Sequence, residues 1–183
     1  MPASITPRVR LRRLNRLFGV TILPVDDELR LRPFAGAADV DAAWPWYQDP
    51  ETVGLLDGPG SPTYARDRVV ALYDARGAQG EVYVIEQAIS DGWEAVGDVT
   101  LAPQTLPIVV APGRRRQGIG RRVLLRLVDR ARVLGWSELR VRGVVEGNEA
   151  SHRLLGGLGF VAVEPGPPAY VLRLAPLGGR PRW

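Results

Sequence analysis

A basic, glycine-containing turn, Arg115-Arg116-Gln117-Gly118-Ile119-Gly120, constrains the fold of this chain more than any other feature. A strand-like apolar run, residues 106–111, leads into the turn, and an amphipathic helix over residues 121–134 follows it. Two glycines one residue apart let backbone N–H groups at the helix start approach an anion that a Cβ atom would keep away. The arginines of the turn have forked donors that suit phosphate. The pattern therefore predicts an anion-binding strand-turn-helix unit, although a basic turn that binds nothing would look the same.

Two scarce residue types narrow the chemistry open to this chain. Its 183 residues contain no cysteine, which excludes disulfides, acyl-cysteine intermediates and thiolate zinc sites within them. The one histidine, His152, would have to serve any Ser-His-Asp triad, and it cannot build a histidine-rich metal site. We therefore expect no metal centre, and we expect any group transfer to pass directly from donor to acceptor.

Charge is divided unevenly along the chain. Residues 1–20 carry five arginines and no acidic residue, residues 21–100 have a net charge of −10, and residues 101–183 have a net charge of +9. An acidic first half and a basic second half can offer different surfaces to ligands of opposite charge. Scattered surface charge is the alternative interpretation.

We expect one domain over residues 21–176, preceded by an arginine-rich extension (1–20) and followed by a short tail (177–183). Residues 21–183 have a net charge of −1, so nucleic-acid binding, which we do not expect, would depend on the extension alone. No apolar run approaches the roughly 20 residues that span a bilayer. The extension also lacks the apolar core of a secretory signal. These features predict a cytoplasmic protein without membrane contact, and they leave a homodimer open.

Local patterns predict an α/β fold with a mixed central sheet flanked by helices, in the order β-α-α-β-β-β-α-β-α-β-β. No GxGxxG motif follows the first strand, which argues against a dinucleotide-binding fold. Gly135 is expected to end one helix in the left-handed conformation, and Asn148 is expected to cap the next. The expected strands cover residues 28–34, 81–86, 94–101, 105–111, 138–145, 160–164 and 169–174, and the expected helices cover 35–47, 63–76, 121–134 and 148–158.

Two motifs in this order of elements resemble those of the GCN5-related N-acetyltransferase (GNAT) family. Arg115-x-x-Gly118-x-Gly120 is similar to the family's acetyl-CoA signature, Arg/Gln-x-x-Gly-x-Gly/Ala, and Pro112 is placed like the proline after its fourth strand. Residues 148–160 resemble its Asn-x-x-Ser…Leu-Gly-Phe segment. The resemblance implies a sheet that splays between its fourth and fifth strands. Residues 30–33 and 49–51 look most like the subgroup with ribosomal-protein alanine N-acetyltransferases and aminoglycoside 6′-N-acetyltransferases.

The resemblance also implies acetyl-CoA as the acyl donor and a primary amine as the acceptor. Backbone groups of the fourth strand would pair with the pantetheine arm, and one of their N–H groups would stabilise the oxyanion. The turn and helix start would hold the diphosphate, in agreement with the basic charge of residues 101–183. The predicted cofactor-binding residues are Ile108, Val109, Val110, Arg115, Arg116, Gln117, Gly118, Ile119, Gly120, Arg121 and Asn148.

Family members often carry a tyrosine that protonates the leaving thiolate, and here that position is Leu155. Ser151, directly or through a water, is our candidate substitute, and Tyr170 is a second. Local bonding within its helix is the alternative role for Ser151. A further departure is Arg116, which stands where glycine is common in the family.

The acceptor's ammonium group must lose a proton before attack, and we predict Asp98 as the base. Glu94 and Asp98 have the same parity along one strand and are therefore expected to share a face. Aromatic rings beside carboxylates suit an organic cation, as where Trp44, Trp46 and Tyr47 lie beside Asp49, Glu51 and Asp57. Trp46 is therefore predicted to bind the acceptor, together with Glu94 from the acidic half of the chain. A core position is the alternative for the tryptophan, and Glu146 and Glu164 are alternatives for the base.

We therefore expect an N-acetyltransferase that acts on a peptide or protein N-terminus or on an amino-sugar-like small molecule. The alternative is a non-catalytic acyl-CoA-binding or sensing module with the same fold, which Leu155 leaves open.

Overall fold

The computed structural model describes residues 21–163 and 169–175. The predicted N-terminal extension, the turn that contains Glu164 and the predicted tail from residue 177 onward lie outside the described residues. None of the described helices is both long enough and apolar enough to cross a membrane.

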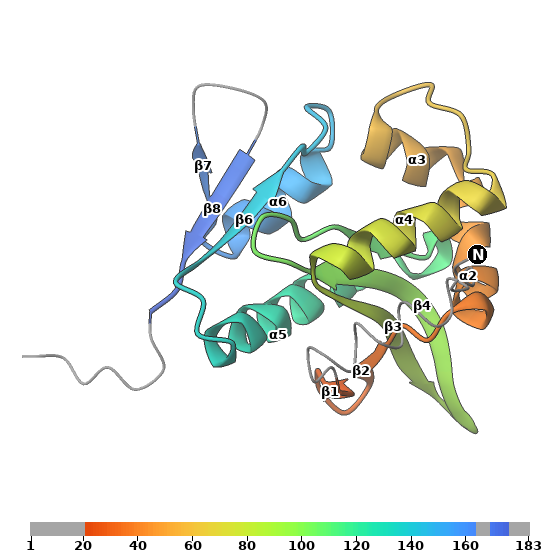
Figure 1. Cartoon of the computed structure of the whole chain (residues 1–183), viewed down its shortest axis with the longest axis horizontal. Coiled ribbons are helices and arrows are strands. Elements are labelled where there is room, and N and C mark those ends of the chain that lie inside the picture. The colour runs from red at the N-terminus through yellow and green to blue at the C-terminus, as the bar shows by residue number, and fades with distance from the viewer. Residues whose placement is uncertain (1–20, 164–168, 176–183) are drawn as a thin grey trace, which may run out of the picture.

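The described strands form two antiparallel sheets that lie side by side (Figure 1). The larger sheet has the order β1-β2-β3-β4-β5, and the smaller sheet has the order β6-β8-β7. The edge strand β5 of the larger sheet and the edge strand β6 of the smaller sheet form no backbone pairing with each other among the described residues. The predicted splay between the fourth and fifth expected strands is therefore confirmed. The strands are β1 (Leu23–Pro24), β2 (Leu29–Pro33), β3 (Glu81–Ile89), β4 (Gly92–Leu101), β5 (Ile108–Val110), β6 (Glu138–Arg142), β7 (Val161–Val163) and β8 (Ala169–Arg173).

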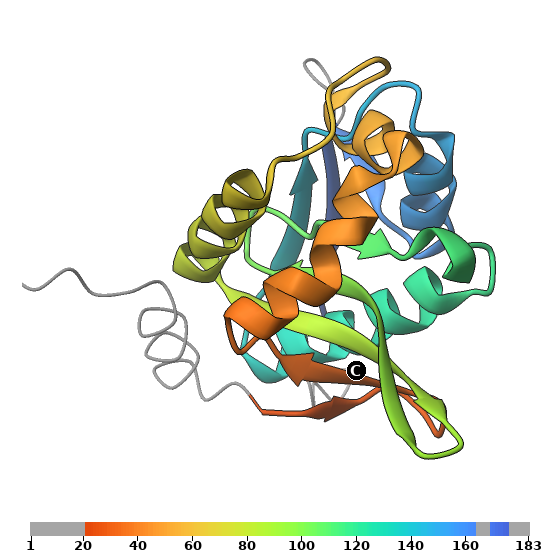
Figure 2. The same cartoon turned by 90° about the vertical axis from the view of Figure 1, so that its right-hand side faces the viewer.

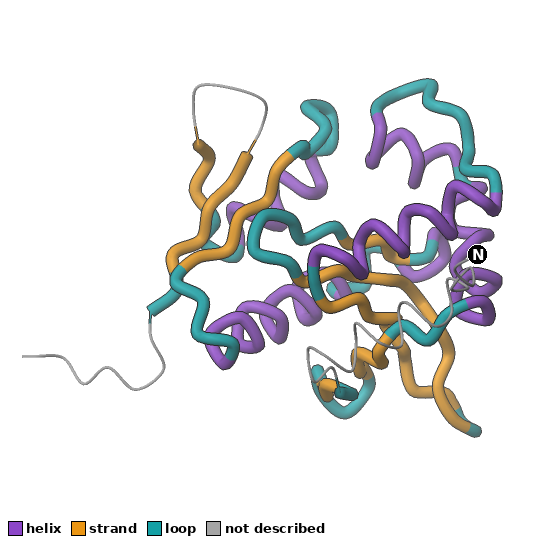
Figure 3. Tube along the Cα trace, in the orientation of Figure 1, coloured by secondary structure: helices purple, strands orange, loops and turns teal. Residues whose placement is uncertain are grey.

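Helices cover both faces of the larger sheet, as Figures 2 and 3 show. The elements α2 (Ala37–Ala43), η1 (Trp44–Gln48), α3 (Pro50–Asp57) and α4 (Arg66–Gln79) come before β3 in the chain. A short η2 (Pro112–Arg114), α5 (Ile119–Val133) and α6 (Glu149–Gly157) follow β5.

Alternation along the strands divides the interior into two cores. In β3, Val82 and Val84 pack on the side of α2–α4, whereas Tyr83 and Ile85 pack on the side of α5. The apolar stripe of α5 lies in the second of these cores together with residues of β6 and α6. The strands β1 to β4 and the helices before β3 belong to the acidic half of the chain, whereas β5, α5, β6 and α6 belong to the basic half.

Two parts of the helix prediction around residues 50–66 are wrong. Residues 50–57, to which we assigned no helix, form α3, because Asp49 accepts a bond from the backbone N–H of Thr52 and Pro50 occupies the first helical position. The helix expected from residue 63 begins instead at Arg66. The N–H of Tyr64 donates to the Tyr47 carbonyl at 3.1 Å, so this residue is held in a tertiary contact before the helix starts.

A β-bulge in β4 overturns the expected sharing of a face by Glu94 and Asp98. Ile85 pairs with Gly97 but Glu86 pairs with Ala95, so Val96 is an extra residue between the two carboxylates. The extra residue reverses the alternation, and the parity argument is therefore wrong. The bulge lies beside Gly97, where a Cβ atom would collide with the carbonyl oxygen of Val109 in β5, so only glycine allows β5 to approach this closely.

The two local capping predictions are confirmed. Gly135 follows α5 with φ of 76°, the left-handed conformation. The Asn148 side chain accepts from the backbone N–H of Ser151 at 3.0 Å and so caps α6.

Candidate active site

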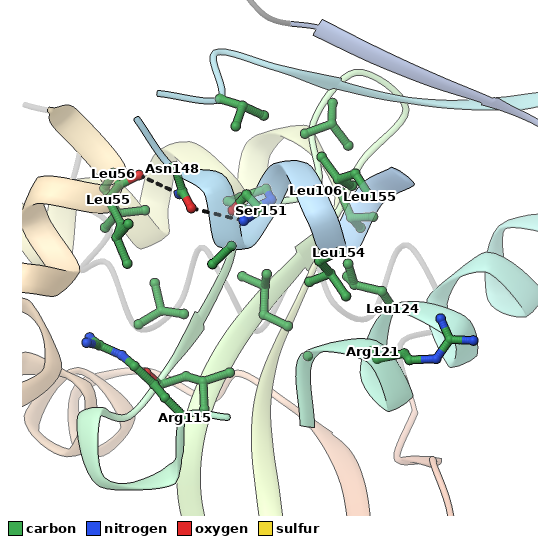
Figure 4. A pocket seen from close by; sticks show the side chains of 18 of the residues that line it. Leu55, Leu56, Leu106, Arg115, Arg121, Leu124, Asn148, Ser151, Leu154 and Leu155 are labelled. Carbon is green, nitrogen blue, oxygen red and sulfur yellow. Dashed lines mark hydrogen bonds between the residues drawn. The ribbon is translucent and has the colours of Figure 1, made fainter. Parts of the chain in front are cut away.

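A cavity of about 600 Å³ opens where the two sheets diverge. Its walls come from α3, β5, the start of α5, the end of β6 and α6, so elements from both halves of the chain meet there (Figure 4). The predicted turn is part of the wall, and of the predicted cofactor-binding residues every one except Gln117 lines it. The Gln117 amide instead donates to the Gly113 carbonyl at 3.3 Å.

The turn before α5 has the open backbone that the sequence predicted. Gly118 caps α5 with φ of 75°, and Arg116 also has a positive φ of 60°. The first backbone bond into the helix runs from Arg122 to the Gly118 carbonyl, so the N–H groups of the preceding turn have no intrahelical acceptor. Together with the helix dipole, these N–H groups favour an anion at the start of α5.

The charge of the cavity is strongly basic. Six arginines line it, all from the basic part of the chain, and the only carboxylate among its described lining residues is that of Glu51. Such an excess raises the local concentration of anions. The arginines are Arg114, Arg115, Arg116, Arg121, Arg142 and Arg153.

Arg115 extends toward α3 and joins the turn to that helix (Figure 4). Its Nη2 donates to Asp49 Oδ2 at 2.7 Å and also to the Thr52 hydroxyl, and its Nε donates to the Val110 carbonyl at 3.4 Å. Burial raises the pKa of the Asp49 carboxyl, but bonds from Thr52 and Arg115 outweigh this effect and hold the pKa below its usual value. Arg115 therefore positions α3 at the cavity as well as lining it.

Asn148 makes a second connection to α3. Its Nδ2 donates to the Leu55 carbonyl at 2.9 Å while its Oδ1 caps α6, so one buried amide bridges the two helices across the cavity (Figure 4). Ser151 and Leu155 lie further along α6, and both line the cavity. Leu155 is 4% exposed, and it places an aliphatic side chain where the family often has a hydroxyl.

Asp98 lies away from the cavity, in the core on the α4 side of the sheet. The residue is 0% exposed, and its carboxylate accepts from Arg76 Nη1 at 2.8 Å and from the hydroxyls of Tyr47 and Tyr73 at 2.9 and 2.8 Å. Burial raises the pKa of the Asp98 carboxyl against the opposing effect of Arg76 and the tyrosines. The pKa values of both tyrosines are raised as well, first by burial and then by Asp98. This geometry favours a structural role for Asp98.

The two predicted acceptor-binding residues also lie outside the lining of the cavity. Trp46 is 7% exposed and belongs to the core on the α4 side, which agrees with the core alternative. Glu94 is exposed and forms an ion pair with Arg114 of η2. Sequence reasoning noted Glu51 only as one of the carboxylates beside the aromatic residues, and it missed Leu55. It recognised no helix there, although Asp49-Pro50 is a good helix start.

The histidine and Tyr170, our second candidate acid, form a pair. His152 Nδ1 lies 2.6 Å from the Tyr170 hydroxyl, and its Nε2 lies 3.1 and 3.0 Å from the carbonyls of Val145 and Glu146. Carbonyls only accept, so Nε2 carries a proton and donates to them. Tyr170 does not line the cavity.

The cavity also faces the edge of β5 that pairs with no other described strand, where the Val110 carbonyl accepts from Arg115 Nε. On the other edge of β5, the Ala111 N–H donates to the Val96 carbonyl and the Thr100 N–H donates to the Pro107 carbonyl. In an antiparallel ladder the bonded residues alternate, so the backbone groups of Ile108 and Val110 point away from β4. An extended ligand can pair with this edge as an added strand. The unpaired edge, the diverging sheets and the anion-favouring turn together form a site that fits an extended anionic ligand.

Comparison with known proteins assigns the family. The family model for the acetyltransferase (GNAT) domain matches residues 28–161, and the chain therefore belongs to the GNAT acetyltransferase family. The predicted family and fold are confirmed, and membership makes acetyl-CoA the co-substrate. No curated protein matches the chain by sequence.

Solved structures show the same fold. Spermidine N-acetyltransferase from Vibrio cholerae, in complex with CoA and spermine, has a TM-score of 0.65 at 17% identity, over 81% of this chain and 96% of that chain. RimL, a ribosomal alpha-N-protein acetyltransferase in complex with coenzyme A, has a TM-score of 0.64 at 15% identity, over 84% and 98%. The protein yncA from Salmonella typhimurium, with its cofactor acetyl-CoA, has a TM-score of 0.57 at 25% identity, over 82% and 96%.

Proposed function

We propose that this protein is an N-acetyltransferase that moves the acetyl group of acetyl-CoA to a primary amine by direct attack. One observation carries the proposal: the unpaired edge of β5 and the open first turn of α5 face the same basic cavity. A ligand that combines an extended diamide arm with a diphosphate fits both features at once.

Each part of the cavity has a role in this proposal. The N–H groups of Ile119, Gly120 and Arg121 would hold the diphosphate, because they precede the first bonded N–H of α5. Both backbone groups of Ile108 and the N–H of Val110 would pair with the amides of the pantetheine arm, whereas the Val110 carbonyl already accepts from Arg115 Nε. One of these N–H groups would also donate to the thioester oxygen as negative charge develops on it.

Acetyl-CoA supplies an activated thioester carbonyl, so the protein has to bring the amine to it and stabilise the charge. A thiolate with a solution pKa of roughly 8.5 leaves without much help. A general acid adds about 10²–10⁴-fold. Ser151 lines the cavity and is our candidate to donate to the thiolate, directly or through a water. The absence of a tyrosine at position 155 therefore lowers the rate without preventing transfer.

Two measurements test the proposal. Saturating acetyl-CoA should raise the thermal unfolding temperature, because a ligand that binds only the native state stabilises it. A panel of primary amines should then release free CoA thiol, with the acetylated amine identified by mass spectrometry. No shift in unfolding temperature at saturating acetyl-CoA would refute the assignment of the cavity.

One observation favours a second candidate, a module that binds acyl-CoA without turnover. The described residues that line the cavity include no tyrosine, histidine or cysteine, and Leu155 replaces the usual hydroxyl. Thermal stabilisation by acetyl-CoA without thiol release for any amine would support this module. Release that depends on the amine would exclude it.

A further inference from the structure

A small groove adjoins the cavity on the side of α3. It has a volume of about 230 Å³ and shares Glu51 and Leu55 with the larger cavity. Its other walls are aliphatic side chains and glycines, so Glu51 is the one charged side chain among the described residues that line it. The complete lining is Glu51, Gly54, Leu55, Pro59, Val145 and Gly147.

We infer that this groove binds the acetyl acceptor, that Glu51 holds its ammonium group, and that the acceptor is a singly charged amine with an apolar substituent beside the nitrogen. The inference rests on the proposed function and adds the acceptor class to it. The ammonium binds where the groove meets the cavity, and the apolar substituent occupies the groove.

The orientation of Glu51 leaves its carboxylate able to accept further bonds. Glu51 lies in the first turn of α3, and its side chain is 70% exposed. Arg115 Nη1 lies 2.7 Å from Glu51 Oε2, but it makes no hydrogen bond of good geometry. Arg115 therefore pairs with one carboxylate oxygen and holds it at the cavity, while the exposed Oε1 remains available to accept from an ammonium group.

The charges around the site select a single positive charge. The cavity beyond Glu51 is lined by six arginines, and Glu51 is the only carboxylate that lines either space among the described residues. A polyamine would place its second and third charges either against these arginines or in the aliphatic groove, where a charge is poorly solvated. An apolar substituent instead gains from leaving water.

Fixed side-chain contacts hold the walls of the groove in place. His152 donates from Nε2 to the carbonyls of Val145 and Glu146, and Tyr170 holds the other side of the ring. On the opposite wall, Asn148 bonds to the Leu55 carbonyl. The groove is therefore formed before a ligand binds, which lowers the entropic cost of binding.

The first test compares Glu51→Gln with Glu138→Gln, which removes the same charge from β6 at a position that lines neither space. With leucinamide as acceptor, Glu51→Gln should raise KM about tenfold or more, while the Kd of acetyl-CoA measured by calorimetry stays within about twofold. Glu138→Gln should change neither value. An unchanged KM in Glu51→Gln, or an equal loss of acetyl-CoA affinity, would overturn the role of Glu51.

The second test fills the groove. Gly54 and Gly156 both lie in helices, and a Cβ atom at either would meet nothing within 4 Å, but only Gly54 lines the groove. Gly54→Leu should lower kcat/KM for leucinamide about tenfold more than for glycinamide, whereas Gly156→Leu should affect the two amines equally. Equal effects of Gly54→Leu on both amines would overturn the location of the apolar substituent.

Two further readouts separate this inference from the proposed function. Wild-type protein should use leucinamide in preference to spermidine, and the opposite preference would overturn the acceptor class. If the protein turns over no amine at all, the proposed function fails, but ligand-observed NMR of leucinamide with CoA-loaded protein still decides the inference. Binding that Glu51→Gln removes would support the groove, and no binding or equal binding by both proteins would overturn it.

Discussion

Replacement of Asp98 by asparagine separates a structural role for this carboxylate from the catalytic role that its sequence position suggested. The asparagine side chain would keep the size of the group and an acceptor for a tyrosine hydroxyl, but it would leave Arg76 without its counter-charge. Both members of this pair are buried, with side chains that are 8% exposed for Arg76 and 0% for Asp98. Removal of one partner from a buried ion pair costs about 3–5 kcal/mol, because the other charge stays buried and uncompensated.

Asp98→Ala should cost more than Asp98→Asn. The alanine variant also removes the acceptor for the hydroxyls of Tyr47 and Tyr73, each worth about 1 kcal/mol as a hydrogen bond. The asparagine variant should therefore lose about 3–5 kcal/mol of unfolding free energy and the alanine variant about 1–2 kcal/mol beyond that. Losses of this size are a large part of the roughly 5–15 kcal/mol that stabilises an ordinary domain.

Urea unfolding followed by circular dichroism measures these losses of unfolding free energy. The kcat for acetyl-CoA turnover is then measured in the absence of urea, where the variants are still folded. Asp41→Asn is the control, because Asp41 pairs with Arg66 on the exposed surface and should matter little. The double variant Arg76→Met with Asp98→Leu should lose less stability than either single change, since no unpaired charge is left. A loss below about 1 kcal/mol together with a fall in kcat of about 100-fold or more would refute the structural role and support Asp98 as the base.

Three further predictions follow from the turn and its connection to α3. Gly118→Val should abolish acetyl-CoA binding measured by calorimetry, because a branched side chain at φ of 75° is strained and fills the space before α5. Circular dichroism should still show a folded protein. Unchanged affinity for acetyl-CoA would contradict the assigned turn. Arg115→Ala should weaken acetyl-CoA binding by about 1.5–3 kcal/mol. Asp49→Asn keeps the Arg115 guanidinium but weakens its bond to α3. An equal loss of acetyl-CoA affinity in both variants would therefore show that Arg115 acts by positioning α3. The pKa of Asp49 is lower in the folded protein than in the unfolded chain, so its contribution to stability is fully present above the unfolded pKa of roughly 4 and is lost as pH falls through the folded pKa. Urea unfolding between pH 2 and 8 should therefore show a smaller acid-induced loss of unfolding free energy in Asp49→Asn than in the wild type. Above pH 5 the two curves of unfolding free energy against pH should be parallel.

Local patterns were enough to predict most of the elements and one wall of the cavity. The glycine turn before α5, the left-handed Gly135 and the Asn148 cap each depend on backbone conformations that neighbouring residues impose. The apolar stripe of α5 and the alternation of β3 follow from the periods of helix and strand. Each of these features depends on residues that are close together in the sequence, so the sequence alone is enough to predict it.

Tertiary structure alone decided which carboxylates reach the cavity. One extra residue in β4, Val96, reverses the alternation between Glu94 and Asp98, and no local pattern announces it. Arg115 meets Asp49 across 66 positions in sequence, and Asp98 meets Arg76 across 22. Glu51 becomes the carboxylate of the cavity only because these contacts set α3 against the opposite wall. The sequence thus determined backbone conformation and the division of charge, whereas the assignment of each charge to core, surface or site required the packing of distant segments, because burial and ion pairing depend on what lies nearby in space.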